Sequence, residues 1–151
     1  MKQRSDRCLF CDIAGGIEPA AVVYQDEHAM VIMDLFPITP GHTLVIPKSH
    51  HLHMETMPEP LANHLFSLAR RTVRAHKMAG WPAVAHNFLV NDGPEANQHI
   101  PHVHLHVIPR RGGDGLSAGV SMFTRMLKIW GLKRRRQLLE QQAAELRMYF
   151  S

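Results

Sequence analysis

The hydrophobic positions of the chain form five short runs separated by polar, turn-forming segments. Apolar and β-branched residues dominate these runs, and proline, glycine, asparagine or aspartate stands between most of them. Runs of this length and composition are typical of β-strands. We therefore predict strands over residues 22–24, 29–34, 42–47, 85–91 and 102–108.

A longer segment between the third and fourth runs has the spacing of an amphipathic helix. Leu61, Leu65 and Leu68 recur at three- and four-residue intervals, whereas arginines occupy the opposite face. Gly80 follows the segment and is typical of a helix end. The pattern predicts a helix over residues 60–79.

The order of these elements indicates the fold class. The strands form two groups on either side of one crossover helix, and regular βαβ alternation is absent. This order favours an α+β fold with a five-stranded, mostly antiparallel sheet. Apolar residues recur at helical spacing again after Met122, so we expect a C-terminal helix. We assign residues 1–151 to one domain, in which residues 117–151 form a C-terminal helical extension.

The composition is that of an ordinary globular protein. Hydrophobic residues make up 45% and charged residues 20% of the 151 positions, which is enough apolar material for one core. The apolar runs are far shorter than the roughly 20 residues that span a bilayer. The N-terminal segment also lacks the apolar region of a secretory signal. We therefore expect a cytoplasmic protein with no membrane contact.

Histidine is the outlier in the composition, with 12 of 151 residues. In the last predicted strand, His102, His104 and His106 alternate with aliphatic residues. Because successive side chains of a strand point to opposite faces, we expect the three imidazoles on one face and the aliphatic side chains on the other. Imidazole is a nucleophile, a proton carrier near neutral pH and a common metal ligand. This face is therefore the candidate functional site.

The string HVHLHVI over residues 102–108 resembles the motif of the histidine triad proteins, a family of nucleotide hydrolases and transferases. The loop NDGPEANQ over residues 91–98 and the segment MDLFPITPGHTLVIPKSH over residues 33–50 are similar to other motif blocks of that family. The resemblance implies attack on the α-phosphorus, a nucleotidyl-histidine intermediate and release of a nucleoside monophosphate. Phosphoramidates, acyl nucleotides and dinucleoside polyphosphates are the implied substrates. Both the fragile histidine triad branch and the bacterial phosphoramidase type fit.

The same resemblance implies the catalytic residues. His104, the middle histidine, is the implied nucleophile, and His106 the residue that contacts the phosphoryl oxygens. A neutral imidazole suits the first role, and we expect a hydrogen bond from its other nitrogen to a backbone carbonyl to fix its tautomer. His99 stands where relatives usually carry serine or threonine. It is either a general acid toward the leaving group or a solvent-facing loop residue.

The implied nucleotide-binding residues lie upstream of the triad and in the preceding loop. Asp34 is expected to accept hydrogen bonds from the ribose hydroxyls, and its other interpretation is a turn-forming acid at a strand end. Asn91 and Gln98 map to positions that contact the phosphate or the leaving group. The candidates for an apolar base pocket are Phe10, Ile32 and Leu35. These three fit equally well as ordinary core residues. We expect a purine nucleotide of the adenosine type.

A CxxC pair near the start of the chain indicates a metal site. Alone, such a pair is compatible with redox chemistry, metal binding or two buried thiols. In some related proteins a CxxC pair, a histidine after the IPK strand and the first triad histidine bind structural zinc. The zinc ligands that the resemblance implies here are Cys8, Cys11, His50 and His102. His51 is the alternative to His50, and His99 to His102. Two thiolates and two imidazoles suit a closed tetrahedral site.

Two other functions are compatible with the sequence. One is a nucleotide-binding regulatory module with little catalysis, which the intact triad argues against. The other is nucleic-acid binding through basic residues 133–136, which supply much of the net charge of +4. A charge run at a helix end is usually a solvated face, so we do not expect a nucleic-acid partner. Most relatives join two five-stranded sheets, and the resemblance therefore implies a homodimer.

Overall fold

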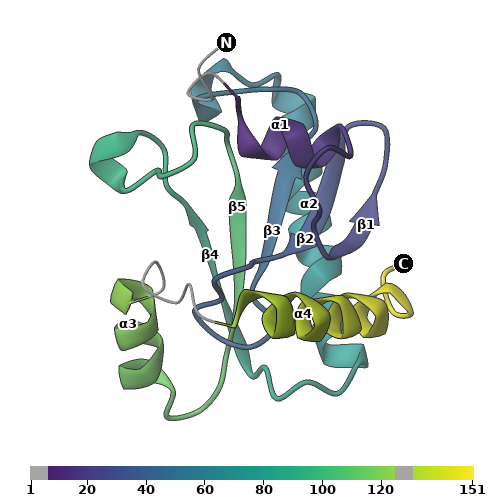
Figure 1. The fold of residues 1–151 in the computed structure, drawn as a ribbon, viewed down its shortest axis with the longest axis vertical. Coiled ribbons are helices and arrows are strands. Elements are labelled where there is room, and N and C mark those ends of the chain that lie inside the picture. The colour runs from purple at the N-terminus through teal and green to yellow at the C-terminus, as the bar shows by residue number, and fades with distance from the viewer. Residues whose placement is uncertain (1–6, 125–130) are drawn as a thin grey trace.

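The computed structural model describes residues 7–124 and 131–151, which include a five-stranded sheet (Figure 1). The strands are β1 (Val22–Gln25), β2 (Ala29–Met33), β3 (Thr43–Pro47), β4 (Ala85–Val90) and β5 (Leu105–Arg110). Their spatial order is β1-β2-β3-β5-β4, and each neighbouring pair is antiparallel. This sheet, combined with the helices packed on it, confirms the predicted α+β class.

Helices flank the sheet on several sides. The helices of the described residues are α1 (Leu9–Ala14), α2 (Glu59–Met78), α3 (Gly115–Thr124) and α4 (Leu132–Arg147), and short 3-10 turns lie at Met54–Thr56 and Pro94–Ala96. In Figure 1, α2 runs behind the sheet, α1 lies near the upper end of the strands and α4 crosses near the lower end. α3 lies toward the β4 edge of the sheet (Figure 1).

The central strands β2 and β3 are buried along their whole lengths because both faces of the sheet are covered. Alternate side chains enter different apolar clusters. Val31 and Val45 pack in a cluster that includes residues of α2 and α4. Ile32 and Leu44 pack in a second cluster with Phe10 of α1. The pattern of alternation therefore fixes α1 over one face of the sheet.

α2 confirms the predicted amphipathic helix, and it begins and ends one residue earlier than expected. Leu65, Leu68 and Thr72 are buried at three- and four-residue intervals on the side that packs against the sheet. Gly80 follows the helix with a φ of +72°, a conformation that glycine adopts without steric cost. The end of the helix is therefore set by the residue that the sequence indicated.

The histidine-rich strand begins later than predicted. Residues 102–104 precede β5, which pairs with β3 only from Leu105 onward. In place of a strand partner, the N–H of Val103 donates to the carbonyl of His51 over 2.7 Å. The strand prediction over residues 102–108 was therefore wrong at its first three positions, because this part of the chain bonds to a loop.

The C-terminal region contains two described helices where the sequence predicted one helical extension. The second of them, α4, buries Leu139, Ala143 and Leu146 in the cluster that includes β1 and β2 residues. Part of the predicted extension, residues 125–130, lies outside the described residues, as do residues 1–6 of the N-terminal segment. The assignment of one domain stays a prediction. Within the described parts of the chain, every helix is too short or too polar to cross a membrane.

Candidate active site

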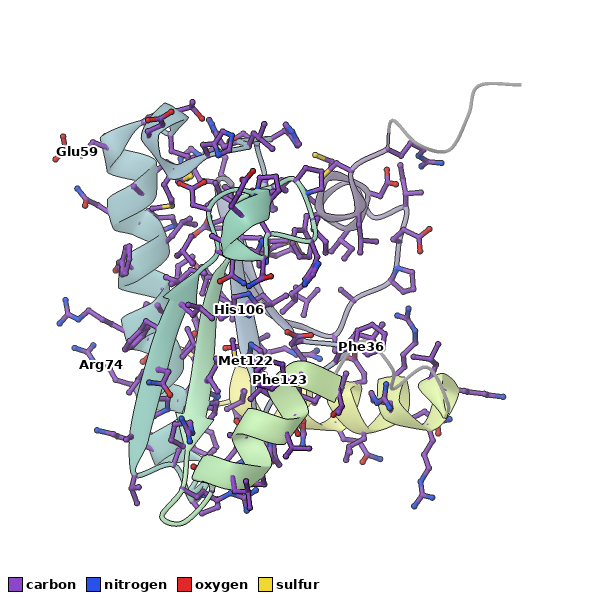
Figure 2. All side chains as sticks on the ribbon, turned by 90° about the vertical axis from the view of Figure 1, so that its left-hand side faces the viewer. Phe36, Glu59, Arg74, His106, Met122 and Phe123 are labelled. Atoms are coloured by element: carbon purple, nitrogen blue, oxygen red, sulfur yellow. The ribbon has the colours of Figure 1, made fainter. Side chains whose placement is uncertain are left out.

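A cavity of about 430 Å³ opens between α1, the end of β2, the loop after β4 and the first half of α4. Its volume lies in the range typical of small-molecule sites. His104 and His106 line it from the triad segment, and Asp34 lines it from the end of β2. Figure 2 shows His106 on the sheet side of this region, with Phe36 on the far side. Segments that are distant in the sequence therefore meet at one cavity.

The backbone holds the His104 ring in one tautomer. Nδ1 of His104 donates to the carbonyl oxygen of His102 over 2.7 Å. A neutral imidazole has a single N–H, so this hydrogen bond assigns the lone pair to Nε2. The ring also packs edge-on against Phe10, with centroids 5.1 Å apart. The structure thus contains the backbone hydrogen bond that a nucleophilic His104 requires.

A second imidazole, that of His42, sets the tautomer of His106. The backbone N–H of Ile38 donates to Nδ1 of His42 over 3.1 Å, so neutral His42 carries its proton on Nε2. This Nε2–H donates to Nδ1 of His106 over 2.9 Å. His106 therefore carries its proton on Nε2, at the end of the ring away from His42. His104 and His106 thus have opposite tautomers, one suited to attack and the other to donate a hydrogen bond.

Asp34 lies beside this buried imidazole pair. Its Oδ2 is 3.4 Å from Nε2 of His42 and 3.9 Å from Nδ1 of His106. Its Oδ1 accepts a hydrogen bond from the N–H of Phe36 over 2.8 Å, as a turn-forming acid does. The three groups are close enough to hold a metal ion. However, the hydrogen bond between His42 and His106 already uses one nitrogen of each ring. A metal ion bound between the three groups would have to replace that hydrogen bond.

The loop between β4 and β5 brings Asn91 and His99 to the cavity. Gln98 of the same loop does not line it. Its amide nitrogen donates to the carbonyl of Leu52 over 3.0 Å, and its oxygen accepts from the N–H of Gly93 over 2.9 Å. Gln98 therefore holds the loop in place through two backbone groups, and its direct contact with a ligand stays a prediction.

The apolar part of the cavity combines residues from α1, β2 and the loop that follows β2. Phe10, Ile32 and Leu35 all line it. Phe10 and Ile32 are also buried in the cluster between α1 and the sheet. The two interpretations of these residues, base pocket and core, are compatible because this cluster borders the cavity.

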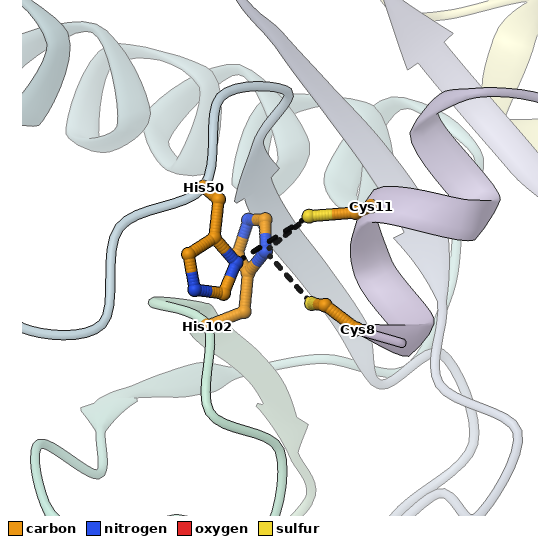
Figure 3. A group of neighbouring side chains, drawn as sticks. All are labelled: Cys8, Cys11, His50 and His102. Atoms are coloured by element: carbon orange, nitrogen blue, oxygen red, sulfur yellow. Dashed lines mark hydrogen bonds between the residues drawn. The ribbon is translucent and has the colours of Figure 1, made fainter. Parts of the chain in front are cut away.

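Four potential metal ligands, one of them the first triad histidine, converge beside His104 and His106 (Figure 3). The ligand atoms of Cys8, Cys11, His50 and His102 all lie within 4.8 Å of one another. The distances from Sγ to Nδ1 are 3.3 Å for Cys8 and His102, 3.4 Å for Cys11 and His50, and 3.6 Å for Cys11 and His102. Tetrahedral zinc separates sulfur and nitrogen ligands by about 3.5 Å, given the usual bond lengths. These four residues therefore fit a zinc ion.

The surroundings favour the metal-binding forms of these residues. His102 donates its Nε2–H to the carbonyl of Pro47 over 2.9 Å, so its Nδ1 is the nitrogen that faces the thiols. Burial lowers the pKa of His102 to about 4, which keeps the ring neutral as a metal ligand must be. Burial and the neighbouring Cys8 raise the pKa of the Cys11 thiol to about 11. A cation bound between the thiols would favour their ionisation.

The alternative histidines lie outside this cluster. His51 is paired through Nε2 with the hydroxyl of Ser49 over 3.0 Å, and His99 lines the cavity. His102 therefore faces the thiols, whereas its neighbours His104 and His106 line the cavity. The three triad rings are adjacent, but they face two different clusters of side chains.

The structure also brings to the site residues that the sequence interpretation did not single out. His42 is completely buried, and only its hydrogen bonds reveal its influence on His106. The one signal in the sequence is a histidine at the start of an otherwise apolar strand. Arg136, Leu139 and Glu140 of α4 also line the cavity. The sequence marked Arg136 only as part of the basic run 133–136, because α4 lies outside the motif blocks.

Comparison with known proteins places the chain in a family. The HIT domain profile matches residues 16–113. An uncharacterized HIT-like protein of Methanocaldococcus jannaschii is 41% identical over 108 residues, which cover 72% of this chain and 82% of that protein. An adenylylsulfatase of Arabidopsis thaliana is 35% identical over 126 residues, which cover 81% of this chain and 61% of the plant protein.

A solved structure shows the same fold over nearly the whole chain. It is the structure of a zinc-bound histidine triad family protein from Mycobacterium smegmatis, with a TM-score of 0.72 and 35% identity over 94% of this chain and 96% of that chain. This chain belongs to the histidine triad (HIT) family. The family includes nucleotide hydrolases, such as the plant adenylylsulfatase.

Proposed function

We propose that the chain hydrolyses nucleotides at the α-phosphate through a nucleotidyl-histidine intermediate. The observation that carries this proposal is the hydrogen bond from Nδ1 of His104 to the carbonyl of His102, because it assigns a nucleophilic Nε2 to a ring that lines the cavity. Family membership and the plant adenylylsulfatase among the relatives support the same class of reaction.

His104 acts in two steps. In the first, its Nε2 forms a bond to the α-phosphorus, the bond to the leaving group breaks, and the leaving group departs with the electron pair and takes up a proton. In the second, water attacks the phosphorus, the P–N bond breaks and a nucleoside monophosphate is released. Imidazole suits both steps because it is nucleophilic when neutral and is a good leaving group from phosphorus.

His106 stabilises the negative charge that develops on the phosphoryl oxygens. The His42 relay assigns its proton to Nε2, which provides a hydrogen-bond donor held in one orientation. Such preorganised donors are effective in buried sites, and loss of one typically costs on the order of 10²–10³ in rate. Asn91 lines the same cavity and is the second residue that we assign to the phosphate.

Asp34 and the apolar wall orient the nucleoside. The carboxylate of Asp34 accepts hydrogen bonds from the ribose hydroxyls, and Phe10, Ile32 and Leu35 contact the base. The cavity of about 430 Å³ is large enough for a nucleoside monophosphate. We expect a purine nucleotide of the adenosine type, the type that the name of the plant relative indicates.

The leaving group is an amine, a sulfate, an acyl group or a second nucleotide. His99 is exposed at the cavity, where the leaving group departs toward solvent. We assign His99 the role of general acid, because a histidine donates a proton at neutral pH more readily than a hydroxyl does.

We further propose a structural zinc ion held by Cys8, Cys11, His50 and His102. The convergence of their ligand atoms supports this assignment, and so does the zinc-bound relative from Mycobacterium smegmatis. When bound, the ion would crosslink the start of α1 to the segment that follows β3 and to the segment that precedes β5. Because His102 is adjacent to the nucleophile segment, this crosslink would also hold the carbonyl that orients His104.

We also propose a homodimer in the cytoplasm. β4 is an outer strand of the sheet, and its Phe88 and the preceding Val84 are 47% and 78% exposed. Exposed apolar side chains on an edge strand favour pairing with another chain. The free thiols of the CxxC pair suit a reducing compartment.

A substrate panel with product analysis tests the proposed reaction. The panel contains adenosine phosphoramidate, an acyl adenylate, diadenosine triphosphate and a nucleoside diphosphohexose. We expect release of adenosine monophosphate from at least one of the first three and none from the sugar nucleotide. Absence of turnover on every compound would contradict the proposed hydrolase and favour a nucleotide-binding module. Transfer from the sugar nucleotide would favour a transferase.

A further inference from the structure

α4 forms one wall of the cavity, although it lies outside the part of the chain that carries the family motifs. The HIT domain profile ends at residue 113, whereas α4 spans Leu132–Arg147. The residues that α4 contributes to the cavity are Arg136, Leu139 and Glu140. Whatever this wall recognises is therefore a property of the C-terminal part of this chain.

Contacts at both ends hold α4 in position. In its first half, Nη1 of Arg136 donates to the carbonyl of Pro19 over 3.2 Å. After its last turn, Phe150 stacks on Tyr24 of β1 with centroids 4.9 Å apart, and the Arg71 guanidinium lies over both rings. Leu139 is buried between these two anchors. The wall is therefore fixed relative to β1 and to the segment before it.

The α4 wall borders the part of the cavity assigned to the base. With the phosphorus at His104 and the ribose at Asp34, the base extends along the apolar wall that includes Ile32. Ile32 is paired with Val22 of β1, so the segment from Pro19 to Val22 runs beside this wall. Arg136 bonds to the first residue of that segment. Figure 2 agrees, since α4 lies on the Phe36 side of the cavity region, across from His106.

We propose that Arg136 is a specificity-determining residue that makes the site select purine over pyrimidine bases, an inference that rests on the proposed nucleotide hydrolase function. A guanidinium has five N–H donors, and the bond from Nη1 to Pro19 engages only one of them. A two-ring purine reaches farther from the ribose than a pyrimidine and carries acceptor nitrogens on its outer edge. The purine edge therefore extends toward the donors of Arg136, whereas a one-ring pyrimidine ends closer to the ribose.

Neighbouring charged residues of α4 are less suited to this role. Glu140 accepts a hydrogen bond from Arg147 over 2.6 Å, so its carboxylate is engaged along the helix. The Arg135 guanidinium lies over the Phe36 ring, 5.6 Å from its centroid. Arg134 is exposed like Arg136, but it does not line this cavity. Arg134 therefore provides a matched control for Arg136.

Binding of adenosine and uridine monophosphates by calorimetry tests this inference without turnover. We expect the wild type to bind the adenosine nucleotide about tenfold more tightly than the uridine nucleotide, as a good hydrogen bond to a charged donor allows. Arg136→Ala should lose most of this ratio, with uridine monophosphate binding changed by less than about twofold. Arg134→Ala should match the wild type for both nucleotides. A thermal melt of each variant reports whether α4 stays docked.

The outcomes separate this inference from the proposed reaction. An unchanged binding ratio in Arg136→Ala, or equal weakening of both nucleotides, would overturn the role of Arg136. Loss of the ratio in a protein that turns over none of the panel substrates would support Arg136 and contradict the hydrolase. With an active wild type, Arg136→Ala should raise KM for the adenosine substrate and leave kcat nearly unchanged, as loss of uniform binding does. A wild type that binds neither nucleotide would overturn both proposals.

Discussion

Single hydrogen bonds decide which nitrogen of each triad histidine carries the proton. His102 donates from Nε2 to a carbonyl, His104 donates from Nδ1 to another, and His106 accepts at Nδ1 from His42. The number and spacing of the histidines could be read from the sequence, because alternation is a local property of an extended chain. Their tautomers could not, because Pro47 ends β3 and His42 directly precedes it, and both reach the triad only in the folded chain.

Replacement of His42 tests the relay at the residue scale. In His42→Ala the Nδ1 of His106 loses its donor, so either tautomer of His106 becomes accessible and the donor to phosphate is no longer fixed. We expect kcat to fall by roughly ten- to a hundredfold, less than the roughly 10²–10³ for a donor that is lost outright, because His106 itself remains, with little change in KM. His42→Gln keeps a side-chain N–H near the same place and should recover much of the rate.

Steady-state kinetics of both variants, with thermal melts as a control for folding, provide the measurement. Equal rates in the wild type and in a folded His42→Ala variant would contradict the relay. Equal loss in the alanine and glutamine variants would indicate that His42 acts through packing alone.

At the scale of the elements, local patterns predicted α2 within one residue at each end, but they placed the start of β5 three residues too early. The helix follows from periodicity and a terminal glycine, which both lie in one stretch of sequence. The start of β5 depends on where β3 offers backbone partners, which is a tertiary property. The division of the predicted C-terminal extension into α3 and α4 also depends on tertiary packing, so the sequence did not predict two separate helices.

The turn into β3 contains a glycine whose replacement should be costly. Gly41 has a φ of +87°, and a Cβ built on it would lie 2.4 Å from Cζ3 of Trp81. Gly41→Ala should therefore destabilise the protein by more than the about 1–3 kcal/mol that such a backbone conformation costs alone. Gly16→Ala is the matched control, because Gly16 has a similar φ of +73° and open space around it.

Urea denaturation of the two glycine variants measures this difference. The account requires a larger loss of unfolding free energy for Gly41→Ala than for Gly16→Ala. An equal loss would show that Trp81 moves aside at little cost. Since His42 follows Gly41 directly, a drop in kcat for Gly41→Ala is also expected.

The packing between α2 and β4 creates a pH-dependent contribution to stability. The His76 ring is buried with its centroid 5.3 Å from those of Trp81 and His86, and its Nδ1 lies 3.1 Å from Nε2 of His86. Burial, assisted by the charge that His86 can carry, lowers the pKa of His76 to about 4. In the unfolded chain it is about 6.5. The unfolded state therefore binds the proton first as the pH falls, and stability is lost between about pH 6.5 and 4.

The expected loss from His76 is about 3 kcal/mol when the pH falls through this window, because each unit of pKa difference is worth about 1.4 kcal/mol. Unfolding free energies at pH 7 and near pH 4 provide the measurement, with His76→Gln as the variant that does not titrate. The wild type should lose more stability than the variant over this range. Parallel losses in the two proteins would contradict the assigned pKa.

At the scale of the whole molecule, the cavity exists only because α1, β2, β5 and α4 pack together. Most of the residues that the sequence assigned to the nucleotide do line it, among them Asp34, Asn91 and His99. The sequence could assign these residues because they lie in or beside segments that resemble the motif blocks of the family. Two places for the C-terminal stretch, a dimer contact or a cover over the active site, stayed open, since the sequence of a basic amphipathic helix does not say which surface it covers.

Zinc content tests the link between α1 and the triad segment. Protein purified without a histidine tag should contain about one zinc per chain, and chelation should lower Tm, because a structural metal stabilises the folded state. Cys11→Ser should lose zinc and show a similar Tm with or without chelator. Less than about 0.2 zinc per chain would contradict the proposed site.

Light scattering on the same preparation should give twice the chain mass for the proposed homodimer.

The turnover of His104→Ala tests the central proposal most directly. The variant removes the attacking nitrogen but leaves Asp34 and the apolar wall in place. We expect kcat on the best substrate of the panel to fall by at least about 10⁴-fold, as for loss of other catalytic nucleophiles, while adenosine monophosphate binds within about tenfold of the wild type. Retained turnover in a folded His104→Ala variant would contradict the account.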